Sequence, residues 1–152
     1  MKNNIISGDV FTVALSDGDK SLGQVIRHDK RAISCVSVAL FDHKIRGVKN
    51  NKELSMKHCI STMLVVDDLF DDLNFIKIET KKLSIPKKYY PYEKIIKKGG
   101  VGMKITNPAN VVNFLEAYHG LSPWDMMADN QYFDKFLITP NKKPESLIYE
   151  KK

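Results

Sequence analysis

The stretch that most constrains the fold is a run of alternating residues near the N-terminus that turns back on itself. Residues 9–15 alternate along the chain, and residues 22–28 do so again after a turn that contains Asp17 and Gly18. An Asp-Gly pair between two such runs predicts a β-hairpin, because glycine accepts the positive φ that tight turns require. Gly23, inside the second run, indicates a bulge or a close backbone approach, as at the corner of a barrel.

Further strands are expected after the hairpin. Residues 33–41 are apolar on both faces, which is typical of a central strand covered on both sides. Residues 42–51 are polar and predict a loop. Residues 62–66 and 74–79 predict two more strands, and between them we expect one helical turn that begins at Asp67 as its N-cap.

The last third of the chain is expected to be helical. Asn107, followed by proline, is typical of a helix N-cap, and Gly120 is typical of a helix end. Ser122, again followed by proline, and Asp125 repeat the pattern and predict a second helix. The sequence therefore predicts an α+β fold. We expect a small, strongly curved antiparallel β-sheet or SH3-like partial barrel, with two or three helices in the C-terminal third packed on it.

One domain over residues 1–152 is expected, because this length supports a core without disulfides or metals. It divides into a β-rich part (8–80), a loop (81–106), a helical part (107–138) and a charged tail (142–152).

The composition is that of a globular protein with a basic surface. Hydrophobic residues make up 43% of the chain and the net charge is +6. No apolar run approaches the ~20 residues of a membrane span, and residues 1–7 lack the apolar segment of a signal peptide. We expect a cytoplasmic protein without a membrane partner, in which Cys35 and Cys59 are buried apolar groups.

No catalytic, cofactor-binding or metal-binding residues are predicted. The four histidines (His28, His43, His58 and His119) do not fall in a metal-ligand spacing. His119 is expected near a helix C-terminus, where a cation is favourable. The segment Lys97–Gly102 lacks the Gly-Lys-Ser/Thr of a phosphate-binding loop, and Asp17–Asp19 lacks the spaced acids of a calcium loop.

An acidic turn is the most unusual patch of the sequence. Asp67, Asp68, Asp71 and Asp72 enclose a leucine and Phe70. One interpretation is a charge cluster at the start of a helical turn. The other is a protein-binding surface, in which carboxylates beside an exposed Leu or Phe meet a basic partner. We therefore predict these four aspartates and Phe70 as candidate partner-binding residues.

A lysine-rich stretch over residues 77–104 contains Tyr89, Tyr90 and Tyr92. Basic residues interleaved with aromatic rings are typical of nucleic-acid tracks. The other interpretation is a solvated edge whose lysines prevent strand-to-strand aggregation.

Gly8-Asp9-Val10-Phe11, with Leu15, Gly18 and the later Gly-Gln-Val, resembles the opening of the immunity protein 26 family. The resemblance covers about residues 8–86. It implies a non-enzymatic bacterial protein that binds its cognate polymorphic toxin domain in the cytoplasm and blocks it by steric occlusion.

The same residues also fit two alternatives. One is a toxin endoribonuclease of a toxin–antitoxin pair with an SH3-like barrel. Those enzymes resemble this chain in their opening hairpin but carry Arg-Pro before the next strand, and no proline precedes Pro86 here. The other is a non-enzymatic SH3-like barrel that binds nucleic acid through the lysine-rich stretch.

Overall fold

The computed structural model describes residues 4–29, 34–47, 50–91 and 104–151. The strands are β1 (Asp9–Ala14), β2 (Lys20–Asp29), β3 (Cys35–Ile45), β4 (Cys59–Val66), β5 (Phe75–Thr80) and β6 (Ile105–Thr106), and the α-helix is α2 (Pro108–Tyr118). Short 3₁₀ turns are η1 (Met56–His58), η2 (Leu69–Asp71), η3 (Lys87–Tyr89), η4 (Phe133–Phe136) and η5 (Pro140–Lys142). Within these ranges no helix is long and apolar enough to cross a membrane.

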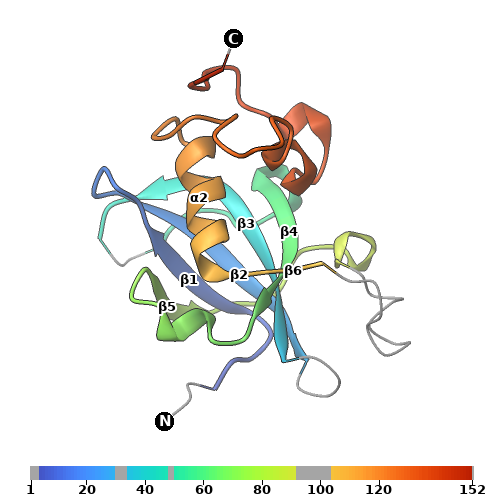
Figure 1. The fold of residues 1–152 in the computed structure, drawn as a ribbon. Coiled ribbons are helices and arrows are strands. Elements are labelled where there is room, and N and C mark those ends of the chain that lie inside the picture. The colour runs from blue at the N-terminus through green and yellow to red at the C-terminus, as the bar shows by residue number, and fades with distance from the viewer. Residues whose placement is uncertain (1–3, 30–33, 48–49, 92–103, 152) are drawn as a thin grey trace.

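The strands form one mixed sheet in the order β5-β1-β2-β3-β4-β6, and α2 lies across one of its faces (Figure 1). The pair β4 and β6 is parallel, and the other neighbours are antiparallel. The sheet is open and does not close into a barrel. The predicted α+β class is confirmed, whereas the expected count of two or three helices is not confirmed.

Side chains on the two faces of the sheet build two hydrophobic clusters. Phe11, Val25 and Val38 lie in the cluster that α2 and the C-terminal segment cover. Leu22 and Phe41 lie in the cluster on the other face, which the segments around η1 and η3 cover. This partition follows the period-two alternation of the strands, as the sequence predicts. The central position of β3, buried on both faces, is also confirmed.

The N-terminal hairpin forms as predicted. Gly18 occupies the turn with φ of 91°, and the ladder of β2 with β3 shifts its register beside Gly23. A Cβ atom added at Gly23 would lie 2.3 Å from Cζ of Phe11, so the Phe11 ring occupies the space that a side chain at this position would need. The bulge expected at Gly23 is therefore confirmed, and the group that lies close to its backbone is the side-chain ring of Phe11.

Gly8 and Asp9 connect this hairpin to β5. Asp9 is fully buried, and its carboxylate accepts a hydrogen bond from the Thr80 hydroxyl at 2.9 Å. The same carboxylate lies 3.0 Å from Nζ of Lys77 and accepts the backbone N–H of Ile6. A buried carboxylate needs such partners to offset its lost hydration. The Gly-Asp opening therefore has a structural role.

β3 is longer than the sequence predicts. The prediction of a loop over residues 42–51 is wrong for Asp42–Ile45, because these four residues continue the strand. Ile45 and Lys44 pair with the first residues of β2, and Nζ of Lys44 lies 2.5 Å from the Asp17 carboxylate in the hairpin turn. Cross-strand pairing and this ion pair hold a polar sequence in extended form, where local composition favours a loop.

α2 begins and ends where the sequence predicts. The side chain of Asn107 accepts the N–H of Asn110 at 2.8 Å, and Gly120 follows the helix with φ of 75°. Val111, Phe114 and Leu115 are buried against the sheet. The helix thus combines a local capping signal with an apolar stripe.

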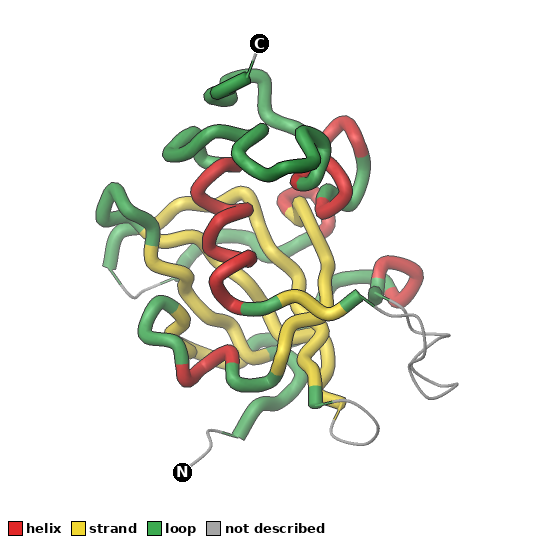
Figure 2. Tube along the Cα trace, in the orientation of Figure 1, coloured by secondary structure: helices red, strands yellow, loops and turns green. Residues whose placement is uncertain are grey.

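The second helix predicted from Ser122 does not form. Residues 121–132 have irregular structure, and only the short turns η4 and η5 follow (Figure 2). The backbone N–H of Trp124 donates to the Ile148 carbonyl at 2.7 Å, and the Asp125 carboxylate accepts the backbone N–H groups of Glu150 and Lys151. Asp125 therefore holds the chain end and does not cap a helix. Near the C-terminus, Pro123 and Ile148 form a single isolated parallel bridge.

Both cysteines are buried free thiols, as expected. Burial raises the pKa of the Cys59 thiol to about 11, so this group stays protonated and unreactive at neutral pH.

Candidate functional site

The acidic turn lies between β4 and β5, and its buried anchor is Leu69 in η2. The prediction that Asp67 caps this turn is wrong. Asp68 stands at the N-cap position, without a side-chain capping hydrogen bond, and the Asp67 carboxylate lies 3.2 Å from Nε2 of His28. Asp72 accepts the N–H of Asn74 at 2.8 Å, which turns the chain into β5. Two of the four aspartates therefore shape the turn.

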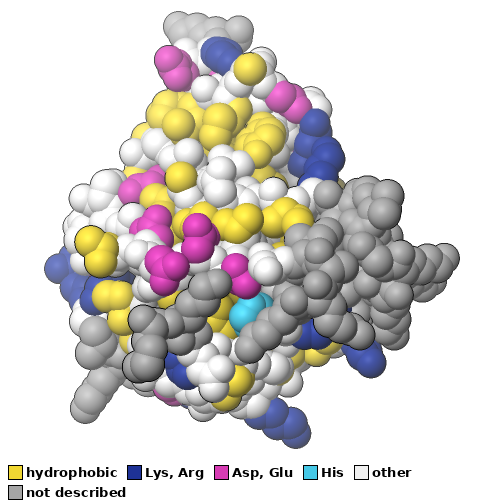
Figure 3. All heavy atoms as spheres, turned by 60° about the horizontal axis from the view of Figure 1, so that its bottom comes forward, with side chains coloured by type: hydrophobic (Ala, Val, Ile, Leu, Met, Phe, Trp, Pro, Cys, Tyr) yellow, Lys and Arg dark blue, Asp and Glu magenta, His cyan; other side chains and the backbone are white. Residues whose placement is uncertain are grey.

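The other two aspartates face solvent. Asp68 and Asp71 are exposed, and no cation pairs with either of them among the described residues. Figure 3 shows acidic side chains gathered on this face beside hydrophobic ones. Phe70 is half-buried, and its ring contacts Phe11 edge-on with centroids 5.5 Å apart. Phe70 thus anchors the turn to the core and presents only part of its ring.

Sequence reasoning missed the apolar part of this surface. Leu73 is 93% exposed and Ile76 is 49% exposed. Together with Phe70 they line a shallow hollow, with Asn4 of the N-terminal segment at its margin. The alternation along β5 predicts that Ile76 is exposed, because Phe75 points into the core and its neighbour in a strand must point to the other side. We call Asp68, Asp71, Leu73 and Ile76 the acidic–apolar surface.

β5 is an edge strand of the described sheet, so this surface adjoins a strand with one unpaired side. Lys77 on that strand forms an ion pair with the carboxylate of buried Asp9. Exposed apolar side chains beside unneutralised carboxylates are suited to a partner that brings both an apolar side chain and positive charge.

The remaining predicted patches lie elsewhere. Asp17 and Asp19 form ion pairs with Lys44 and Arg46, as residues of a hairpin turn. Lys97–Gly102 lies outside the described residues, as do all of residues 92–103 of the lysine-rich stretch, including Tyr92. In the described part of that stretch, Tyr89 and Tyr90 are half-buried against the second hydrophobic cluster. Their rings are therefore only partly available for stacking on bases.

Two of the histidines lie at the end of α2 and in β2. His119 is largely buried, and desolvation together with nearby Lys44 lowers the pKa of its imidazole to about 4. It is therefore neutral at physiological pH, which corrects the expectation of a cation at this helix end. Its ring contacts Ser21 at 3.3 Å. His28 contacts Asp67 of the acidic turn.

The other two histidines, His43 and His58, converge on Asp42. All three side chains place a possible ligand atom within 4.8 Å of the others. Sequence spacing does not indicate this cluster, because His58 belongs to a separate element that folds back beside β3.

Comparisons of this chain with protein-family models, with curated proteins and with solved structures gave no match.

Proposed function

We propose that the protein is an immunity protein, which binds a cognate bacterial toxin in the cytoplasm and neutralises it by steric occlusion without catalysis. The observation that carries the proposal is the acidic–apolar surface. Leu73 extends into solvent beside Asp68 and Asp71, neither of which has a cationic partner within the described residues. The resemblance of the N-terminal hairpin to the immunity protein 26 family supports the same function.

In the isolated chain, the acidic–apolar surface leaves Leu73 without apolar cover. Full burial of a leucine side chain contributes about 1.5–3 kcal/mol, and Leu73 obtains almost none of it in the isolated chain. An apolar centre with charged residues at its rim is the usual anatomy of a protein interface. Carboxylates at the rim attract a basic partner and orient it during encounter. A basic groove on the toxin, filled by this surface, would be closed to its substrate.

We further propose that the open sheet has the curvature of an SH3-like partial barrel. Register shifts in the ladders of β1 with β5, β2 with β3, and β3 with β4 support it, because bulges bend and twist a sheet. A rigid, bulged sheet presents the turn between β4 and β5 in a fixed position, and a preorganised surface loses little entropy when it binds.

The first test is co-expression with the toxin domain encoded beside this gene. The full chain is expected to rescue growth and to form a stable complex with that domain. Leu73→Ala and Asp71→Lys are each expected to weaken the complex about tenfold or more, since both residues belong to the surface and neither supports the core. Affinity is measured by calorimetry with purified proteins.

The matched control is Glu145→Lys, the same charge reversal at an exposed residue of the C-terminal segment, away from η2 and β5 (Figure 1). It is expected to leave affinity unchanged. Equal affinity of all variants would refute the role of the surface. Binding of labelled RNA at low salt, weakened by added salt and unaffected by Leu73→Ala, would instead favour the nucleic-acid alternative.

A further inference from the structure

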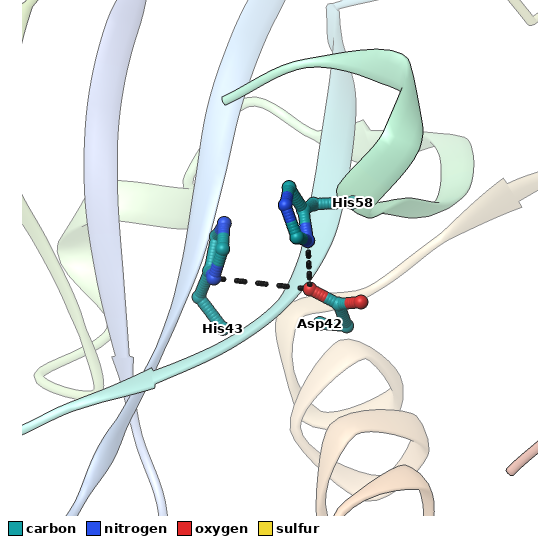
Figure 4. Close-up of side chains that lie close together, drawn as sticks. All are labelled: Asp42, His43 and His58. Atoms are coloured by element: carbon teal, nitrogen blue, oxygen red, sulfur yellow. Dashed lines mark hydrogen bonds and ion pairs between the residues drawn. The ribbon is translucent and has the colours of Figure 1, made fainter. Parts of the chain in front are cut away.

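We propose that Asp42, His43 and His58 form a binding site for one divalent transition-metal ion of the zinc class. Figure 4 shows the three side chains pointing toward one another, two from β3 and one from η1. The site is separate from the acidic–apolar surface, and the inference does not depend on the proposed function.

A bulge in β3 brings the first two ligands to one side. Consecutive residues of a regular strand point to opposite faces of the sheet. In the ladder of β2 with β3, Ser21 pairs with Lys44 and Gly23 pairs with Leu40. Leu22 alone therefore lies opposite the three residues 41–43. This irregularity turns Asp42 and His43 toward each other, so that Nδ1 of His43 lies 3.8 Å from Oδ1 of Asp42. Bulges commonly re-aim side chains at functional sites.

The tautomer of His43 follows from its second contact. Its Nε2 lies 2.7 Å from the carbonyl oxygen of Glu53, which can only accept, so Nε2 carries the proton. In neutral His43 the lone pair is then on Nδ1, and it faces the Asp42 carboxylate across a gap too long for a hydrogen bond. Two electron-rich atoms that face each other in this way are suited to a cation between them. A backbone carbonyl on the other ring nitrogen is the usual support of a metal-binding histidine.

His58 supplies the third ligand atom. Its Nδ1 lies 3.1 Å from the same Oδ1 of Asp42, and its Nε2 lies 3.9 Å from the Glu53 carboxylate. The rings of His43 and His58 have their centroids 4.3 Å apart. Metal binding would displace the proton that joins His58 to Asp42. Glu53 would then face both outer ring nitrogens, with its carbonyl toward His43 and its carboxylate toward His58.

The spacing and the ligand types indicate the ion. Ligands about 2.1 Å from a tetrahedral metal lie about 3.4 Å apart, and the two Asp42–histidine distances, 3.1 and 3.8 Å, lie on either side of that value. Two imidazoles and one carboxylate match zinc-class ions, whereas calcium and magnesium prefer oxygen ligands alone. The side chain of Asp42 is 35% exposed and that of His43 is 12% exposed, so an ion can enter and one position stays open to water or to a partner's side chain.

The test uses the full chain after removal of metals with a chelator. We expect calorimetry to show one Zn²⁺ per chain, and Co²⁺ to give the visible absorption of a low-coordinate nitrogen and oxygen site. His43→Gln and His58→Gln are each expected to weaken binding by about 10–100-fold or more. Glu53→Ala keeps the backbone carbonyl and removes only the carboxylate, so a smaller loss is expected.

His28→Gln is the matched control, because His28 also contacts an aspartate but lies in no cluster of three ligands among the described residues. It should bind Zn²⁺ like the unaltered chain. The ¹⁵N resonances of the imidazoles in the unaltered chain give a readout that does not depend on variants folding. One equivalent of Zn²⁺ should shift those of His43 and His58 and leave the other two histidines in place. Absence of binding, unchanged affinity in folded His43→Gln, or no shift at His43 and His58 would overturn the proposal.

Discussion

The N-terminal hairpin and the segment after α2 bury their large side chains by different means. In the hairpin, hydrogen bonds between the strands pair the backbone N–H and C=O groups. Gly23, which has no side chain, leaves room for the ring of Phe11. In residues 121–151, which form no ladder, individual side chains make key polar contacts. The Asp125 carboxylate accepts two backbone N–H groups of the tail, and the indole Nε1–H of buried Trp124 donates to the Asp134 carboxylate at 3.2 Å. The hairpin depends on its backbone ladder and on the fit of a ring against a glycine, whereas the C-terminal segment depends on a few individual side chains.

The largest effect is expected from Trp124→Ala. The indole is 1% exposed and packs within 6 Å of the Phe114 and Phe133 rings, so its removal leaves a cavity in the cluster that covers the sheet. We expect a loss of about 3–5 kcal/mol in the free energy of unfolding, measured by denaturant titration. Trp124→Phe keeps much of the volume and is the control. A loss under about 1 kcal/mol for the alanine variant would show that the segment is dispensable.

A smaller loss, about 1–3 kcal/mol, is expected from Gly23→Ala. The new methyl group would overlap the Phe11 ring, and the ring cannot move freely between Phe70 and Phe75. Adding Phe11→Leu should recover part of the loss, because the two sites are coupled. Gly18→Ala is the control: its φ is 91° but no atom lies within 4 Å of the new Cβ, so Phe11→Leu should not rescue it. Additive losses in the Gly23 double variant would contradict the close-approach explanation.

The smallest effect is expected at Asp125 and depends on pH. Hydrogen bonds from the Glu150 and Lys151 backbones lower the pKa of this carboxyl below its ordinary 3.8. Its contribution is therefore complete above pH 3.8 and is lost as the pH falls through the lowered value of the folded state. Asp125→Asn should reduce stability at neutral pH and reduce the further loss in acid. Hydrogen exchange at the Glu150 and Lys151 amides gives the local readout, and unchanged protection in the variant would contradict this account.

The same contrast explains which parts of the fold the sequence predicts. Asp17-Gly18 and Asn107 with its proline act within a few residues, and both elements form where expected. Ser122 and Asp125 carry equally good helix signals, but Asp125 meets N–H groups from the chain end, which a local pattern does not contain. Tertiary contacts override propensity at such places.

The candidate sites show the same limit. The acidic turn is evident in the sequence, but the exposure of Leu73 depends on β5 lying at the edge of the sheet. The approach of Asp42 to His43 depends on a bulge that exists only when β2 and β3 are paired. His58 lies on a different element, and its contact with Asp42 forms only when that element folds back beside β3.

The strand order determines which strands can pair early during folding and which must pair late. β1 to β4 follow one another as antiparallel neighbours, so they can pair as the chain emerges during synthesis. β5 must return to β1, where Phe75 pairs with Val13 and Thr80 with Asp9, and such distant pairing is slow. Until then β1 is an open edge. The turn that carries Leu73 takes its final position only when β5 docks, so under the proposed function a chain in which β5 has not yet paired with β1 cannot bind its toxin through this turn.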